Sequence, residues 1–69
     1  MEALEFNTSR IKRAVFDNES LELTIEFTRG GTYKYRDVDY NTWLGFVGAD
    51  SPGKFFEKNI KGKFDYMKD

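Results

Sequence analysis

Lysine side chains at helical spacing are the groups of this sequence most suited to binding chemistry. Lys54, Lys58 and Lys61 stand at i, i+4 and i+7, which places three ammonium groups on one helix face, and Lys63 follows at the flank. Such a stripe could contact successive phosphates of a nucleic acid, with an affinity that falls steeply as salt rises. The alternative is an amphipathic helix with a solvated outer face, where Glu57 and Lys61 form an ordinary pair worth about 0.3–0.5 kcal/mol.

A second basic cluster, Arg10, Lys12 and Arg13, is followed by no acid until Asp17. If it lies beside the lysine stripe, the two clusters together could span several phosphates. The alternative is a charged arm and edge strand that resists sheet-to-sheet association. The sequence leaves both placements open.

This chain has few of the side chains that enzymes use for catalysis. It contains no His and no Cys, which excludes a Ser/His/Asp triad, a thiol nucleophile, a redox CxxC pair and an ordinary structural zinc site. Three acids, Asp37, Asp39 and Asp50, stand near expected helix starts, where the helix dipole already favours them. We therefore expect no catalytic residue, no cofactor, no metal site and no enzyme.

Length and charge indicate one small, near-neutral domain of 69 residues, with eleven basic side chains against twelve acidic ones. A chain this short buries only roughly 60% of its unfolded surface, so its twelve aromatic residues must supply much of the core. No stretch approaches the roughly 20 apolar residues of a membrane helix, and the acidic start does not resemble a signal peptide. We expect a cytoplasmic protein with no membrane partner.

Three segments show the alternation of strands. In Leu21–Thr28 every second residue is apolar, Ile11–Phe16 forms an apolar-rich run before it, and Thr32–Val38 repeats the alternation after it. Short polar or glycine-containing turns separate them, which predicts an antiparallel meander. In the first hairpin we expect Phe16 opposite Leu21 and Ala14 opposite Leu23, with Ile11 facing outward unless a bulge intervenes.

The second hairpin contains the Gly30-Gly31 pair. A three-residue loop with Gly31 in the left-handed conformation pairs Phe27 with Tyr33, Ile25 with Tyr35 and Glu26 with Lys34. Both tyrosines then point toward the core, and the outer sheet face carries only polar side chains. This arrangement argues against base stacking on that outer face.

Two helices are expected after the meander. In the first, Asp39 is the N-cap, the stripe is Tyr40, Trp43, Leu44 and Val47, and Gly48 is the stop. The second starts with Ser51 as N-cap and Pro52 at the first helical position, buries Phe56, Ile60 and Phe64, and ends near Lys61 or Lys63. The expected fold class is α+β: a three-stranded antiparallel β-meander followed by two helices packed on one face of the sheet.

Phe55 lies about a third of a turn off the apolar stripe of its helix. It either packs under the loop that contains Ser51 and Gly53, or it remains partly exposed as a contact for a protein partner.

Several segments together resemble the KTSC domain, a short module named for its occurrence at the C-terminus of some lysyl-tRNA synthetase-like proteins. The resemblance covers about residues 9–64 of a single domain spanning 1–69, with short tails at each end. One departure is Ala14-Val15-Phe16, where the family tends to show Val-Gly-Tyr. The matching positions are Ser9, Ile11, Leu21 to Phe27, Gly31 to Tyr35, Val38, Ala49 to Phe56, Asn59 and Ile60.

This resemblance implies no catalytic residue, and the fusion to a tRNA-handling enzyme suggests nucleic acid only by analogy. Two functions follow from the sequence. One is a non-enzymatic accessory module that binds RNA or DNA backbone, of the RNA/tRNA class, through the basic helix. The other is a protein-interaction module without nucleic-acid binding, which uses an exposed strand edge or the Phe55 region and has a homodimer as one of its possible forms.

Overall fold

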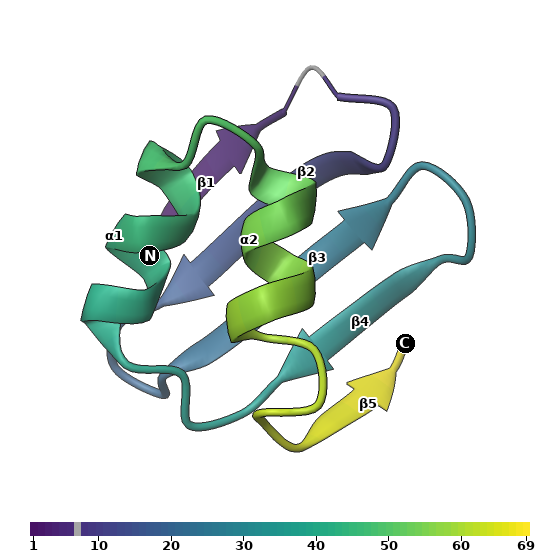
Figure 1. Ribbon diagram of the computed structural model, residues 1–69. Helices are drawn as coiled ribbons and strands as arrows, with labels where there is room; N and C mark the ends of the chain where they lie inside the picture. The colour runs from purple at the N-terminus through teal and green to yellow at the C-terminus, as the bar shows by residue number, and fades with distance from the viewer. Residues whose placement is uncertain (7) are drawn as a thin grey trace.

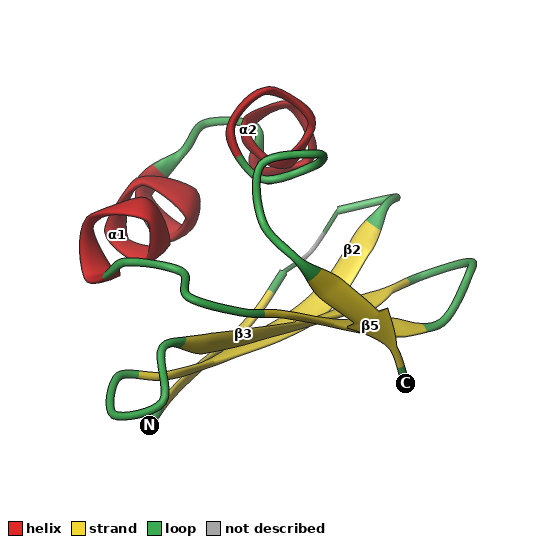
Figure 2. Ribbon diagram, turned by 90° about the horizontal axis from the view of Figure 1, so that it is seen from below, coloured by secondary structure: helices red, strands yellow, loops and turns green. Residues whose placement is uncertain are grey.

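The computed structural model describes residues 1–6 and 8–69 and contains a five-stranded antiparallel sheet in the order β1-β2-β3-β4-β5. The strands are β1 (Glu2–Glu5), β2 (Ile11–Asp17), β3 (Glu22–Phe27), β4 (Thr32–Tyr35) and β5 (Tyr66–Lys68). Between β4 and β5 the chain forms α1 (Tyr40–Gly48) and α2 (Pro52–Asn59). Both helices lie on the same face of the sheet (Figures 1 and 2), and we call the other one the open face.

The α+β class and the helix placement agree with expectation, but the number of strands does not. Strands β2, β3 and β4 form the expected meander, whereas the two segments taken as tails pair with its edges as β1 and β5. Each edge of a three-stranded meander presents unpaired backbone N–H and C=O groups. The terminal segments satisfy them and widen the sheet.

The register of the second hairpin differs from the prediction by two positions. Ile25 pairs with Tyr33 and Leu23 with Tyr35, because the loop closes between Phe27 and Gly31, whose carbonyl accepts the Phe27 N–H at 2.9 Å. Gly31 has a positive φ of 92°, as predicted. The error moves each partner by two positions, so both tyrosines still lie on the helix-bearing face.

The first hairpin shows the same kind of shift. Ala14 pairs with Ile25 and Phe16 with Leu23, so the predicted partners were wrong by two positions. The register changes between Ile11 and Arg13, and Ile11 is fully buried. The bulge at this point turns Ile11 inward, as the sequence required for an apolar side chain there.

Helix α1 has the predicted N-cap but buries a different face. The Asp39 carboxylate accepts the Thr42 N–H at 3.2 Å, and the helix ends at Gly48. The buried residues are Trp43 and Phe46, whereas Leu44 is 45% exposed. The predicted stripe omitted Phe46, whose ring packs near Phe6, Trp43 and Phe55.

Contacts at both sides of α1 explain this orientation. The Trp43 Nε1–H donates to the Glu2 carboxylate at 3.0 Å, which ties the helix to the edge strand β1. On the other side, a Cβ atom at Gly45 would lie 2.8 Å from the Phe55 ring. The absence of a side chain at Gly45 therefore allows α2 to approach α1 closely.

Helix α2 begins as predicted and ends earlier. The Ser51 hydroxyl accepts the Lys54 N–H at 3.4 Å, and Pro52 occupies the first helical position. Phe56 and Ile60 are buried, and Phe64 is partly buried against the same core. The helix ends at Asn59, and the chain then turns at Gly62, which has a φ of 76°.

The difference between the expected and observed face of α1 gives a stability test. Phe46→Ala should lower the free energy of unfolding by about 3–5 kcal/mol because it removes a fully buried ring. Leu44→Ala should stay within about 0.5 kcal/mol, since that side chain is largely in water. Urea unfolding followed by the fluorescence of Trp43 measures both, and equal losses would contradict the observed helix face.

Candidate functional site

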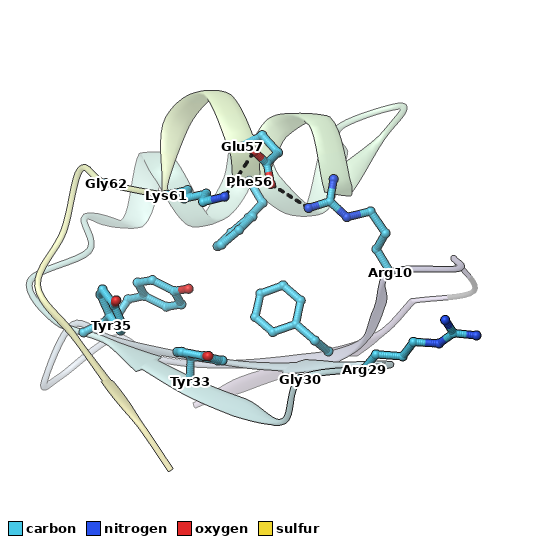
Figure 3. Close-up of a pocket in the computed structure, with 11 residues that line it drawn as sticks. Arg10, Arg29, Gly30, Tyr33, Tyr35, Phe56, Glu57, Lys61 and Gly62 are labelled. Carbon is cyan, nitrogen blue, oxygen red and sulfur yellow. Dashed lines mark hydrogen bonds and ion pairs between the residues drawn. The ribbon is translucent and has the colours of Figure 1, made fainter.

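A cleft of about 440 Å³ opens between α2 and the sheet, beside the β3–β4 hairpin and β5 (Figure 3). Its interior is aromatic, with rings from both the sheet and the helix. Its mouth carries three basic side chains and one acidic one. The lining residues are Arg10, Phe27, Arg29, Gly30, Tyr33, Tyr35, Phe56, Glu57, Lys61, Gly62 and Tyr66.

The rings of the cleft are held against one another. Phe56 descends from α2, and its ring centroid lies 5.1 Å from that of Phe27 and 5.7 Å from that of Tyr35. Tyr33 lies on the floor, 5.8 Å from Phe27 and 5.7 Å from Tyr66. These separations fall within the range in which aromatic rings attract one another, so the floor is an ordered aromatic surface.

Tyr35 is the deepest phenol of this group, with 5% of its surface exposed. Burial raises its pKa to about 12, and the neighbouring Tyr33 and Tyr66 add to the effect. The phenol therefore stays neutral further into the alkaline range than an ordinary tyrosine does.

The mouth of the cleft is organised around one carboxylate. Glu57 accepts a hydrogen bond from the Arg10 guanidinium at 2.6 Å and lies 3.7 Å from the Lys61 ammonium. The hydrogen bond from Arg10, with the charge of Lys61, holds the pKa of Glu57 below its usual value. Gly53 leaves room for the Arg10 side chain, since a Cβ there would lie 3.3 Å from its Cδ.

The predicted lysine stripe is divided by the early end of α2. Lys54 and Lys58 lie within the helix on its exposed outer face, whereas Lys61 and Lys63 follow its last residue. Lys61 reaches back toward Glu57 at the cleft mouth (Figure 3). Only Lys61 of these lysines lines the cleft, whereas Lys54 and Lys58 stay on the outer face of the helix, so the four do not form one continuous helical row.

The second basic cluster is split between the two faces of the sheet. Arg10 joins the cleft mouth through Glu57. Arg13 alternates with the buried Ala14 and so lies on the open face, where its register partner is Glu26. Lys12 also reaches Glu26, at 3.7 Å. Only Arg10 therefore shares a surface with the lysines of α2.

Phe55, the predicted protein contact, lies between the helices. It is partly buried, contacts Gly45, and its ring centroid is 6.1 Å from that of Phe46. The ring packs, but against α1 and not under the loop that contains Ser51 and Gly53.

Two side chains of the cleft were not singled out by sequence reasoning. Arg29 comes from the β3–β4 hairpin, and Tyr66 comes from β5, which was taken as a tail. Only a weak signal for β5 is present in the sequence, because Phe64 and Tyr66 flank the polar Asp65 but Met67 and Lys68 break the alternation. No periodic pattern in the sequence pointed to Arg29 as a cleft residue.

In the described part of the chain, no three His, Cys, Asp or Glu side chains gather as metal ligands. Neither α1 nor α2 is long and apolar enough to cross a membrane.

The fold and the cleft define a small α+β domain in which one sheet face carries both helices and an aromatic cavity. The family model of the KTSC domain matches residues 7–64. The crystal structure of a KTSC domain protein from Yersinia pestis superposes with a TM-score of 0.95 at 35% identity, covering 99% of this chain and 96% of that one. The chain belongs to the KTSC domain family.

Two relatives are larger enzymes. The lysine–tRNA ligases of Trichormus variabilis and Nostoc punctiforme are each 38% identical over 58 residues, which cover 84% of this chain and 10% of each ligase. The chain thus spans about a tenth of the length of these curated relatives. The similarity concerns this small segment of them.

The raised pKa of Tyr35 predicts a loss of stability in alkali. The folded pKa of about 12 exceeds the unfolded value of 10.0, so the neutral phenol stabilises the fold below pH 10.0 and this contribution disappears as pH rises toward 12. The loss should reach at most about 2 kcal/mol once solvent screening is allowed for. Urea unfolding across this range should show it in the parent and not in Tyr35→Phe.

The control is Tyr66→Phe, which removes a phenol that is 58% exposed. It should keep most of the alkaline loss. A Tyr35→Phe protein that loses as much stability as the parent would contradict this origin.

Proposed function

We propose that this domain is a non-enzymatic accessory module that binds the phosphate backbone of nucleic acid, of the RNA/tRNA class. The observation that carries the proposal is the convergence of Arg10 and Lys61 on one side of α2, with Lys54 and Lys58 on the adjoining outer face. The similarity to a segment of two lysine–tRNA ligases gives supporting context.

The electrostatics of this surface favour an anion. Arg10 and Lys61 share a single carboxylate, so the group of these three side chains carries a net positive charge. Ion pairs at exposed positions are weak, about 0–1 kcal/mol. A phosphate can therefore replace Glu57 as the partner of Arg10 or Lys61 at little cost, and arginine pairs with phosphate through two hydrogen bonds.

The interface proposed here is smaller than the one expected from sequence. It comprises Arg10, Lys54, Lys58 and Lys61, with Lys63 at its border. Lys12 and Arg13 are left out because they lie with Glu26 on the open face. That division supplies a control with the same change in charge.

Removing two cations from the proposed interface should weaken binding to a short RNA oligonucleotide. Lys58→Gln combined with Lys61→Gln should lower affinity roughly tenfold at low salt and reduce the salt slope by about 0.7 for each lost phosphate contact. Fluorescence anisotropy at several salt concentrations measures both quantities. Lys12→Gln with Arg13→Gln removes the same charge from the open face and should have little effect; equal losses in the two double variants would contradict the location.

Removing the competing carboxylate should have the opposite effect. Glu57→Gln frees Arg10 and Lys61 and should raise RNA affinity severalfold with a steeper salt dependence. Glu19→Gln, in the turn at the far end of β3, is the matched control for the change in net charge. Unchanged affinity in Glu57→Gln would show that the cleft mouth is not part of the interface.

The competing function is a protein-interaction module that self-associates through a strand edge. It predicts a dimer in sedimentation experiments and no affinity for RNA even at low salt. That combination of results would replace the present proposal.

A further inference from the structure

The aromatic cleft lies directly beside the cations proposed to bind the nucleic-acid backbone. Backbone binding itself, however, gives the cleft no role. Phosphate contacts need only charge and hydrogen bonds, and these are supplied at the mouth. The floor and roof of the cavity are rings, chiefly Tyr33, Phe56 and Tyr66. Aromatic surface left accessible in so small a domain points to a ligand with an apolar, flat part.

The shape of the fold keeps this surface open. Helix α2 covers the middle of the sheet, and β4 and β5 extend beyond it (Figures 1 and 2). The turn at Gly62 then carries the chain down to β5 at the side of the cavity. Tyr66 remains 58% exposed, and Tyr33 is partly buried with the Lys68 ammonium over its ring, 5.9 Å from the centroid. Ring surface is therefore accessible from the mouth chiefly at Tyr66, and a ligand that stacks on Tyr33 replaces the Lys68 ammonium there.

The charges around the cavity suit a ligand that joins an aromatic group to an anion. Arg10 and Arg29 lie at one end of the cleft, and Lys61 lies on the helix side above the floor (Figure 3). Glu57 is the single acid among the lining residues. A nucleotide has this combination, because its base stacks on aromatic rings while its phosphates pair with arginine and lysine.

The size of the cavity agrees with this class of ligand. Small-molecule sites have volumes of about 300–1,000 Å³, and the cleft measures about 440 Å³. The neutral Tyr35 phenol at its inner end keeps an O–H group that can donate to a base edge.

We propose that the cleft takes one unpaired base of a single-stranded RNA, stacked against Tyr33 and Tyr66, while the adjoining phosphates contact Arg10 and Lys61. The inference rests on the proposed backbone binding and adds that the domain selects single-stranded over double-stranded RNA. In a duplex the bases are paired and stacked, so they cannot enter the cavity, and only the cations could make contact.

The test compares three probes of matched phosphate number: an unstructured single-stranded RNA, an abasic ribose-phosphate oligomer and an RNA duplex. Base stacking should make the single strand bind at least about fivefold more tightly than the abasic oligomer and the duplex. Equal affinity for all three would overturn the cleft proposal and leave backbone binding standing. No binding of any probe at low salt would overturn both.

Substitutions of single tyrosines test which rings produce the preference for single-stranded RNA. Tyr66→Leu and Tyr33→Leu should remove the advantage of the single strand over the abasic oligomer while the affinity for the abasic oligomer stays unchanged. Tyr40→Leu makes the same substitution at an exposed tyrosine on α1, outside the cleft lining, and should keep the advantage. A Tyr66→Leu protein with the full advantage would overturn the assignment, since Tyr66 lies on an exposed edge strand where folding tolerates change.

An independent readout uses ring resonances. A nucleoside monophosphate should shift the ring protons of Tyr33, Phe56 and Tyr66 upfield in the parent protein, and ribose 5-phosphate should not. Ring protons unmoved by a nucleoside monophosphate at saturating concentration would overturn stacking in the cleft.

Discussion

The alternation of side chains along a strand is the constraint on which this structure depends. In β4 it sends Tyr33 and Tyr35 to the face that carries the helices, and in β5 it sends Tyr66 to the same face. The registers of both hairpins differ from expectation by two positions, yet both tyrosines stay on the expected face. A shift of a single position would have placed the rings on the open face and left the helices without an apolar surface to cover.

The second constraint is the small area that two short helices can cover. α1 and α2 contain nine and eight residues, and they lie over a sheet of five strands. Gly45 lets the Phe55 ring bring them together, so they cover one region of the sheet well. The aromatic surface beyond α2 remains a cleft. Its mouth coincides with the side of α2 that carries Glu57, whose partner Lys61 lies just past the helix end.

Glu57 is the carboxylate that positions the two cations at the mouth of the cleft. It holds Arg10 across the gap between α2 and the loop before β2, and it holds Lys61 just past the helix end. The carboxylate thereby keeps two cations in place near the cleft while it competes with any anionic ligand for them. The open face has a separate ion pair of the same kind between Lys12 and Glu26. The basic residues of the sequence therefore do not form one continuous basic surface.

Local patterns in the sequence were sufficient for the α+β class, the three central strands, both N-caps and the inward direction of the tyrosines. These features depend on residue spacing of two or about 3.6 and on capping side chains, which are visible over a few neighbouring positions. The edge strands β1 and β5, the buried face of α1, the division of the basic residues and the cleft itself were decided by tertiary structure. Each of them depends on contacts between distant segments, such as Glu2 with Trp43, Gly45 with Phe55 and Arg10 with Glu57, and no local periodicity encodes such pairs.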